Sequence, residues 1–387
     1  MIIFYNPHVD DFLAEPVQFR FIGRKALKKY GFIFEEALKT KKVINILVDA
    51  TESGLVPNYI FCRIPKFLRV LITNLELKLW KKINKFGDDL IKINPKNSPS
   101  LDTLFTFSYK SATYNFFLRE NLFRSYNCVV FHLSHYFIET KLKSDNIKLL
   151  NNAYLAGDSD ISENQYFLNF FNWYKKPFLV LPFAVDDRFI CKKVWNTRLN
   201  MVIATGTFHY LDKEKPSSKY ENFIETTRIT TYHPVRRQIF ELSSMKWHFI
   251  HSLISPYRNY CKNKLTNFIN KFNISQSKYF SVNIVDEYNK YKYAVIGEEV
   301  TGFPALGSLE AIACGCILFA VSEFYVSMGL IPHVHYIPYS GNIDEMFNLI
   351  KTNNGYEDIS NNGVLFIKEY YSKSSVFKNW EKTLIQL

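Results

Sequence analysis

The sequence predicts an α/β protein of two domains, each built on a parallel β-sheet with helices on its faces. The chain has 387 residues, more than one hydrophobic core usually supports. Short apolar runs of strand length alternate with amphipathic segments of helix length along most of it. The alternation restarts near residue 200, after a stretch with little periodicity. We therefore expect residues 1–190 and 191–387 to form separate domains.

The first domain opens with a β-α-β pattern. Ile2 to Tyr5 and Val43 to Asp49 are strand-like, and apolar residues recur at helical spacing from Arg24 to Lys39 between them. A unit of this kind predicts neighbouring parallel strands joined by a right-handed crossover. Further strands are expected at 103–107, 128–132, 153–156 and 178–183, and a helix at 165–174.

The second domain is expected to open with a strand at 200–204. Residues 213–229 are polar and charged and predict a surface loop. Strands are expected at 247–253, 279–282, 293–296, 316–321 and 334–337. Helices are expected at 257–272, 285–292, 308–314, 343–351 and 376–385. The pattern leaves open that the last helix packs back on the first domain.

The chain is basic. It has 48 Lys and Arg against 36 Asp and Glu, a formal net charge of +12. Such a charge fits a nucleic acid, an anionic membrane surface or a phosphorylated substrate as the partner. It also fits a coding sequence biased toward A and T, because Lys, Asn, Ile, Phe and Tyr are abundant while Gly and Pro are few. The charge alone therefore leaves the partner open.

The cysteines and the N-terminus predict a cytoplasmic protein. The six cysteines are scattered, and the closest pair, Cys314 and Cys316, is spaced too tightly for the usual metal knuckle. Most lie in apolar runs, so we expect reduced core thiols and no metal. The N-terminus lacks the basic region and long apolar core of a signal peptide. No stretch reaches the ~18 uncharged apolar residues that cross a bilayer.

Residues 63–85 predict a basic amphipathic helix. Apolar residues at helical spacing alternate there with Arg63, Lys66, Arg69, Lys78, Lys81, Lys82 and Lys85. Such a helix can lie in a membrane interface, with Trp and Phe toward the acyl chains and lysines toward anionic head groups. It can equally pack on its own domain and leave a solvated basic face. A peripheral contact with an anionic membrane through 63–85 is one of these two interpretations.

Two histidines follow the strand expected at 128–132. Ligands of open parallel sheets bind outside the carboxyl ends of the strands, where His132 and His135 fall. An imidazole titrates near neutral pH, so either residue could hydrogen-bond a sugar hydroxyl or carry a proton. A purely structural role at the strand end is the alternative.

The stretch 293–321 carries the clearest functional pattern. A strand-like run lies at each end, with a loop containing Gly302 and a helix from Ser308 that ends at Gly315 between them. Free N–H groups and the helix dipole suit a phosphate near Ser308. Glu310, in the first turn, could reach a sugar hydroxyl beside that phosphate. A nucleotide-sugar has both groups at this separation.

A second basic site is expected at the start of another helix. Arg236 and Arg237 follow His233 and Pro234, and proline suits the first helical turn. Arginines oppose the helix dipole there, so an anion drawn to the same place would explain them. Solvated surface charges are the alternative.

Three segments together resemble glycosyltransferase family 4, whose GT-B architecture has two Rossmann-like domains facing across a cleft. Residues 183–189, Phe-Ala-Val-Asp-Asp-Arg-Phe, are similar to the interdomain segment of that family. Residues 206–208, Gly-Thr-Phe, are similar to the glycine turn that opens its donor domain. Residues 302–317 are similar to its donor loop and helix, and their Gly-Cys-Ile ending is also similar to exostosin-like enzymes.

The resemblance implies a retaining transfer from a nucleotide-sugar, with UDP or GDP favoured, to a surface glycan or glycolipid such as lipopolysaccharide or capsule. It implies no essential metal or other cofactor, and action at the inner face of a membrane. Glu310 matches the glutamate that holds the ribose hydroxyls. By position, Arg236 or Arg237 would contact the diphosphate, and His132 or His135 would face the sugar.

The expected donor site departs from the family pattern at one position. Its expected residues are Gly206, Thr207, His233, Glu299, Gly302, Phe303, Ser308, Leu309 and Glu310. The first glutamate of the family's pair falls at Gly302, and a glycine cannot replace a carboxylate. Glu298 or Glu299 is the nearest substitute.

Two other functions stay open. The His233-Pro234 pair is similar to a dipeptide of sialyl- and Kdo-transferases, so a CMP-sugar is the alternative donor. A basic nucleic-acid-binding protein is the non-enzyme alternative, although the sequence offers no RNA- or DNA-binding motif for it.

Overall fold

The structure is a computed structural model of the chain. It describes residues 2–6, 32–40, 45–48, 60, 63–84, 91–93, 99–107, 116–133, 139–209, 218–228, 231–243, 249–257, 282–321, 323–352 and 355–387. The expected helix at 257–272, the expected strand at 279–282 and the first part of the expected helix at 24–39 lie outside these ranges.

The first half of the chain forms a seven-stranded parallel sheet in the order β3-β2-β1-β4-β5-β6-β7. The strands are β1 (Ile2–Asn6), β2 (Asn45–Val48), β3 (Ile91–Ile93), β4 (Ser100–Phe107), β5 (Tyr126–His132), β6 (Ala153–Gly157) and β7 (Leu179–Val180). All residues of β5 except Asn127 are buried. This is the burial of a strand covered on both faces, as parallel sheets require.

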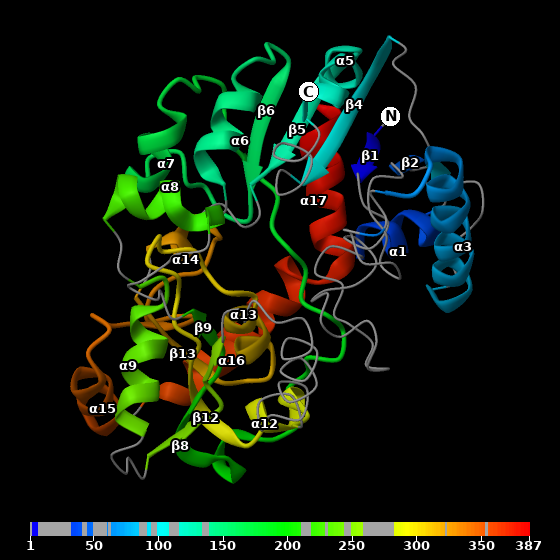
Figure 1. The fold of residues 1–387 in the computed structure, drawn as a ribbon. Helices are drawn as coiled ribbons and strands as arrows, with labels where there is room; N and C mark the ends of the chain where they lie inside the picture. The colour runs from blue at the N-terminus through cyan, green and yellow to red at the C-terminus, as the bar shows by residue number, and fades with distance from the viewer. Residues whose placement is uncertain are drawn as a thin grey trace.

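Helices cover the two faces of this sheet (Figure 1). They are α1 (Phe32–Lys39), α3 (Lys66–Asn84), α5 (Phe116–Arg124), α6 (Thr140–Ile147) and α7 (Gln165–Phe171). Successive side chains of a strand point to opposite faces. Leu104 of β4 accordingly packs in one core cluster with Phe123 of α5 and Ile147 of α6, while its neighbour Phe105 packs in the other with Phe32 of α1.

The second half forms a five-stranded parallel sheet in the order β10-β8-β12-β13-β14, and β9 and β11 form a separate pair. The strands are β8 (Leu199–Ala204), β9 (Thr207–His209), β10 (Ile250–Ser252), β11 (Ser255–Tyr257), β12 (Tyr291–Val295), β13 (Ile317–Ala320) and β14 (Ile337–Pro338). The helices are α8 (Ser218–Thr227), α9 (Pro234–Ser243), α12 (Ile284–Tyr288), α13 (Leu306–Ala313), α14 (Phe324–Ser327), α15 (Ile343–Thr352), α16 (Tyr356–Tyr370) and α17 (Lys373–Ile385). Two parallel sheets with covering helices confirm the predicted α/β class.

One expected element was wrong. The surface loop predicted at 213–229 contains helix α8, whose Phe223 is fully buried. Phe223 stacks on Phe170 of α7 with ring centroids 5.8 Å apart, and on Tyr232 at the same distance. The segment is mostly polar, but Phe223 and Ile224 pack in the core cluster of the first domain, and this packing favours the helix.

The C-terminal helices divide between the two halves (Figure 1). Helix α16 packs on α13, and a Cβ on Gly363 would lie only 2.8 Å from Ile312. Helix α17 packs instead on the first domain beside α1. Trp380 of α17 donates a hydrogen bond from Nε1 to the Pro182 carbonyl at 2.8 Å. The chain therefore returns to the first domain at its end.

Candidate functional site

Several of the predicted donor residues follow the carboxyl ends of β8 and β12: Gly206 and Thr207 follow β8, and Glu299, Gly302 and Phe303 follow β12. These strands are neighbours in the order β10-β8-β12, and the chain leaves them toward opposite sides of the sheet. Such a point, where strand order reverses, is the usual ligand crevice of an open parallel sheet. Residues 205–207 follow β8, residues 296–305 follow β12, and the start of α9 lies against both.

Arg236 of α9 joins the two strand ends. Its Nε donates to the Ile296 carbonyl at 2.7 Å, and its Nη1 donates to the Thr207 carbonyl at 2.6 Å. A Cβ on Gly206 or Gly297 would lie 2.7 or 2.9 Å from the Arg236 side chain, so both positions exclude any larger residue. The buried Arg236 guanidinium is thus held by the two turns that follow β8 and β12.

A second polar cluster fixes the loop after β12 to the next strand. Glu298 is buried, and its Oε1 accepts a hydrogen bond from the Val321 N–H at 3.3 Å. The Tyr325 hydroxyl donates to Ser308 Oγ at 2.7 Å and is also hydrogen-bonded to Glu298. Burial raises the pKa of Glu298, and these hydrogen bonds oppose the rise. Ser308 is buried, so its hydroxyl serves this cluster in the structure.

The loop with Glu299, Gly302 and Phe303 lies between the two halves of the chain. The Gly302 N–H donates to the Glu299 carbonyl at 2.7 Å, which closes a tight turn. Phe303 packs with Phe324 at a ring separation of 5.9 Å, in a cluster shared with the first domain. Asn164 at the start of α7 donates to the Thr301 carbonyl at 3.4 Å. The loop therefore contacts both domains.

Glu310 is the most unusual group at the site. It is the fifth of the eight residues of α13, beyond the first turn in which the sequence placed it, and it is only 7% exposed. Among the residues that the structure describes, its carboxylate has no hydrogen-bond partner. Burial raises its pKa to about 8, against a lowering by the nearby Arg188 guanidinium and a further rise from Asp186. A buried carboxyl without donors is costly and indicates a group that a ligand completes.

The remaining donor-site candidates are less accessible. His233 is buried at the start of α9, where its carbonyl accepts from the Arg237 N–H at 3.0 Å. Leu309 is fully buried in the core, so its side chain serves packing. Arg237 lies on the exposed side of α9 and forms an ion pair with Glu241 at 2.7 Å. Of the two arginines, the structure places only Arg236 at the crevice.

His132 lies in the interior of the first domain and not on the surface of a cleft. Its side chain is fully buried, and its Nε2 lies 2.9 Å from the Leu181 carbonyl and 3.6 Å from Asp158 Oδ1. Its ring stacks on Trp380 of α17. This geometry favours the structural alternative for His132, because no face of the ring is open to a sugar. His135 lies outside the described residues.

Two further residues belong to the site that the sequence did not single out. Gly297 directly follows β12 and packs on Arg236. Arg188 lies in the interdomain segment, and its positive charge lowers the pKa of the Glu310 carboxyl. The signal for Gly297 was a glycine straight after a strand, and that for Arg188 was its place in the segment 183–189.

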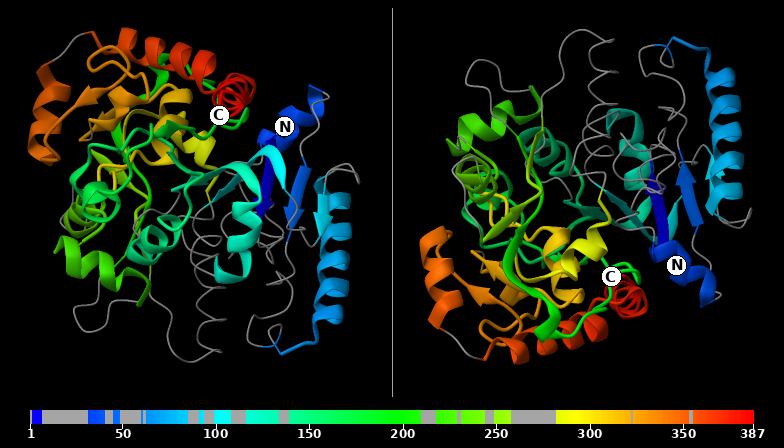
Figure 2. Two further views of the ribbon diagram at one scale, coloured as in Figure 1. Left: turned by 90° about the horizontal axis from the view of Figure 1, so that it is seen from above. Right: turned by 90° about the horizontal axis from the view of Figure 1, so that it is seen from below.

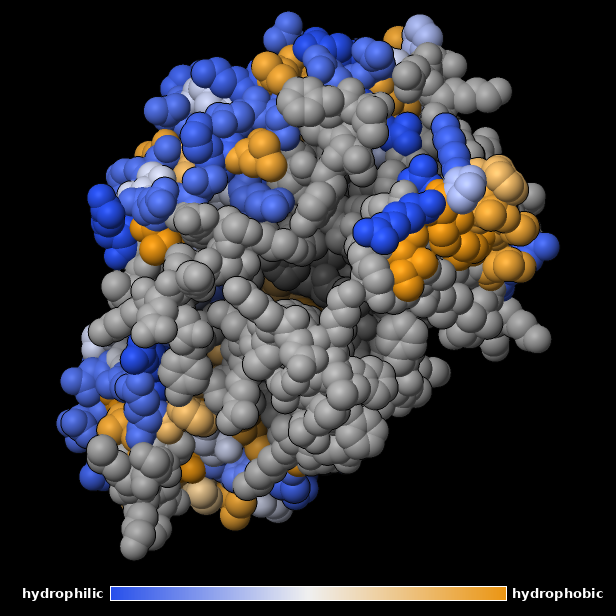
Figure 3. Space-filling model, viewed as in Figure 1, coloured by the Kyte–Doolittle hydropathy of each residue, from blue (hydrophilic) through white to orange (hydrophobic). Residues whose placement is uncertain are grey.

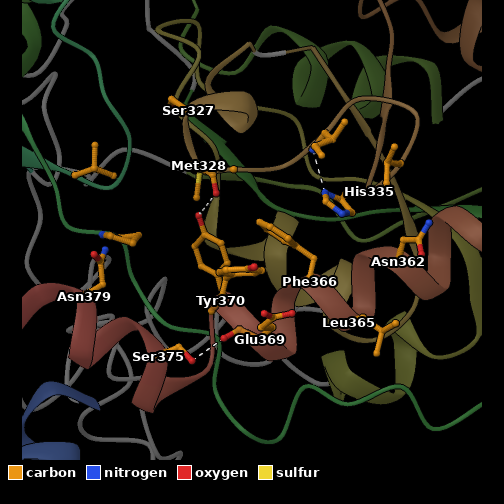
Figure 4. Close-up of a pocket in the computed structure, with 16 residues that line it drawn as sticks. Ser327, Met328, His335, Asn362, Leu365, Phe366, Glu369, Tyr370, Ser375 and Asn379 are labelled. Carbon is orange, nitrogen blue, oxygen red and sulfur yellow. Dashed lines mark hydrogen bonds between the residues drawn. The ribbon is translucent and has the colours of Figure 1, made fainter.

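A separate pocket of about 910 Å³ lies where α16 and α17 meet (Figure 4). Val180 and Pro182 of the first domain form part of its wall, and none of the predicted site residues lines it. Within it the Tyr371 hydroxyl donates to the Met328 carbonyl at 2.7 Å, and His335 Nδ1 accepts from the Ile331 N–H at 3.0 Å. Its inner polar groups thus serve the fold.

The described residues include no group of three or more His, Cys, Asp or Glu side chains that could hold a metal ion. Nor does the described part of the chain contain a helix long and apolar enough to cross a membrane.

Neither a family model nor a curated protein matches the sequence. Solved structures do match the fold. Sucrose-phosphate synthase from Thermosynechococcus elongatus is similar at a TM-score of 0.54 and 12% identity, over 100% of this chain and 98% of that one. Alr3699/HepE from Anabaena, solved with UDP-glucose, is similar at a TM-score of 0.52 and 12% identity, over 100% and 99%. The GT-B architecture expected from the sequence is thereby confirmed.

Proposed function

We propose that the protein is a glycosyltransferase that moves a sugar from a nucleotide-sugar to a glycan or glycolipid. The observation that carries the proposal is the Glu310 carboxyl, buried without a hydrogen-bond donor among the described residues at the crevice of a GT-B fold. Two ribose hydroxyls would supply the missing donors. The similarity of the fold to a structure solved with UDP-glucose supports a donor of this class.

The residues at the crevice suit the two ends of the donor's nucleotide. Glu310 would accept hydrogen bonds from the ribose, and binding would favour its ionised form because both hydroxyls donate to it. Arg236 brings a positive charge to the turns after β8 and β12, where the diphosphate would lie. A fixed cation and oriented N–H groups stabilise the charge that develops on a leaving diphosphate. We expect this arrangement to act without an essential metal.

The donor proposed is a UDP- or GDP-sugar, with a CMP-sugar as the alternative. We further propose that the transfer retains the anomeric configuration and that the acceptor, part of a surface polysaccharide or glycolipid, meets the first domain at the inner face of a membrane. Glu299 is the candidate for the carboxylate that Gly302 lacks, because its loop lies between the two domains.

A thermal-shift screen with UDP, GDP, CMP and their sugar conjugates tests the proposal. A ligand that binds the native state raises the melting temperature in proportion to RT ln(1 + [L]/Kd). We expect UDP or GDP to raise it in the wild type, and Glu310→Gln to lose most of the rise. Glu357→Gln, an exposed glutamate of α16, is the matched control and should keep it.

Other outcomes decide among the alternatives. A shift with CMP alone would select the CMP-sugar donor. A Glu310→Gln protein with the full wild-type response would remove Glu310 from the site. No response to any nucleotide, together with RNA binding that weakens steeply with salt, would replace the enzyme by the nucleic-acid-binding protein.

A further inference from the structure

Helix α3 presents an apolar face to solvent. Phe67, Leu71 and Leu75 are 71%, 54% and 57% exposed, and their spacing of four residues places them in one row along the helix. Leu68 is exposed beside them. A surface helix of a water-soluble protein turns such a row toward its own core. Here the row points the other way.

The inward side of the described part of the same helix is mixed, because Val70 and Ile72 are half-buried beside polar residues. Thr73 is fully buried, and Arg69 is partly buried. Figure 3, viewed as Figure 1, shows hydrophobic residues gathered over α3 with strongly hydrophilic ones beside them. The sequence left open whether 63–85 packs on its own domain through its apolar residues. For the described part of α3, the structure shows the row from Phe67 to Leu75 outside.

The helix also lies where a flat surface can reach it. It belongs to the part of the first domain that holds β3, the edge strand of the seven-stranded sheet. Both views of Figure 2 place α3 at the outer rim of the molecule, away from the second domain. A row on a convex rim suits a planar partner better than a peptide, which needs a groove.

The charge of α3 indicates which kind of planar partner it fits. Helix α3 carries five basic residues (Lys66, Arg69, Lys78, Lys81, Lys82) and one acidic residue (Glu76), a net charge of +4. Lys66 and Lys78 are exposed near the two ends of the apolar row. A second copy of this chain would bring an equally basic helix to the contact, which repulsion opposes. An anionic lipid surface offers both acyl chains for the row and negative head groups for the lysines.

We propose that α3 docks the protein on the surface of a membrane rich in anionic lipid, with Phe67, Leu71 and Leu75 inserted at the interface and Lys66 and Lys78 at the head groups. Docking would hold the first domain beside a lipid-borne acceptor. That last link rests on the proposed function, whereas docking itself does not.

Vesicle flotation of the full-length protein tests the docking. We expect it to float with vesicles of phosphatidylcholine and phosphatidylglycerol, and not with phosphatidylcholine alone. The triple variant Phe67→Ser, Leu71→Ser, Leu75→Ser should lose at least about tenfold in bound fraction, because the apolar and electrostatic terms act together. The double variant Lys66→Glu, Lys78→Glu should also lose binding, most clearly at low salt.

The matched control replaces three exposed apolar residues on other elements, Leu101→Ser, Leu365→Ser and Ile385→Ser, and should float as the wild type does. Circular dichroism shows whether the α3 variant is folded. If the triple variant fails to fold, flotation of the Lys66→Glu, Lys78→Glu double variant tests the docking instead.

Three results would overturn the docking. They are a wild type that does not float with anionic vesicles, an α3 variant that floats undiminished, and a wild-type dimer in sedimentation that the triple variant converts to a monomer. Flotation needs no nucleotide. A missing response to UDP and GDP would therefore defeat the proposed function and leave this inference standing.

Discussion

Glu310 stands in an environment that disfavours its charge. Burial raises its pKa from the ordinary 4.5 to about 8, so the folded protein holds a proton there that the unfolded chain releases near pH 4.5. Between these two pH values the folded state binds more protons than the unfolded state. Stability must therefore fall as pH rises through this window and level off above it.

The glutamine variant isolates this effect. Glu310→Gln keeps the shape of the side chain and removes its titration, so its stability relative to the wild type should increase by about 1.4 kcal/mol for each pH unit between 4.5 and 8. Urea unfolding at a series of pH values measures the difference. If the free energies of unfolding of the variant and the wild type differ by the same amount at every pH in this window, the Glu310 carboxyl has no raised pKa.

Arg236 holds the crevice together through the planar geometry of its guanidinium. Arg236→Lys keeps the charge but cannot make both hydrogen bonds to the Ile296 and Thr207 carbonyls. We expect a loss of about 2–3 kcal/mol in the free energy of unfolding. Arg237→Lys, on the exposed side of the same helix, should cost no more than about 0.5 kcal/mol. Equal losses in the two variants, measured by urea unfolding, would contradict the assigned role.

At this scale the sequence predicted the surroundings of some site residues and not of others. Glu310 and Arg236 were predicted from their places at two helix starts; Arg236 lies at the turns after β8 and β12, and Glu310 lies near Arg188 of the interdomain segment. His132 was predicted from its place at a strand end, but its ring is covered by Trp380, a residue 248 positions later in the chain. Local patterns contain no information about such a distant contact.

At the scale of elements, the turn from α13 to β13 depends on one glycine. Gly315 has φ +84°, and a Cβ there would lie 2.7 Å from Arg198 Nη2. Arg198 is buried and donates from the same Nη2 to the Cys314 carbonyl at 2.6 Å. The Arg198 guanidinium thus anchors the C-terminal end of α13, the helix that carries Glu310.

Gly315→Ala should lower the free energy of unfolding by more than its backbone strain alone accounts for. Gly329→Ala is the matched control, because φ is +85° there and the nearest atom is only the ring edge of Phe366 at 3.3 Å. We expect about 1 kcal/mol for Gly329→Ala and at least about 2 kcal/mol for Gly315→Ala, which must also displace Arg198. Thermal and urea unfolding compare the two. A Gly315→Ala loss no larger than the control would show that Arg198 moves freely.

Helices and strands were predicted well where hydrophobic periodicity is strong. They were predicted poorly where contacts with distant parts of the chain determine the local conformation. The strands β5, β8, β12 and β13 were expected within two or three residues of their bounds. Helix α8 was missed because its composition is mostly polar, and the contacts of Phe223 with Tyr166 and Phe170 join it to a distant part of the chain. Helix α16 was missed as well. Its packing on α13 through Gly363 depends on close approach, which periodicity does not reveal.

At the scale of the whole molecule, α17 follows the second half in sequence but packs on the first. Its Trp380 contacts Phe105 of β4 and Phe32 of α1, with ring centroids 5.0 and 6.2 Å away. The class of fold followed from the β-α alternation, since parallel strands need crossovers. That a helix at the far end of the chain would complete the core of the first domain was only an open possibility in the sequence.

Trp380→Ala should loosen the first domain specifically. Removing a buried tryptophan costs about 3–5 kcal/mol, and its contacts here are with the first sheet. Native-state hydrogen exchange should therefore accelerate in β4 and β5 and stay nearly unchanged in β12 and β13. Loss of protection to the same extent in both sheets would show instead that the molecule unfolds as one unit.

The two places where the chain passes between the domains lie side by side. The Val185 N–H donates to the Tyr371 carbonyl at 2.9 Å, and Lys373 lies 3.3 and 3.4 Å from the carboxylates of Asp186 and Asp187. The two covalent connections between the domains are thus joined to each other by a hydrogen bond and two ion pairs. Arg188 and Asp186, which act on the pKa of Glu310 in opposite directions, both belong to this junction, so the charge around the Glu310 carboxyl is set by the residues that join the domains.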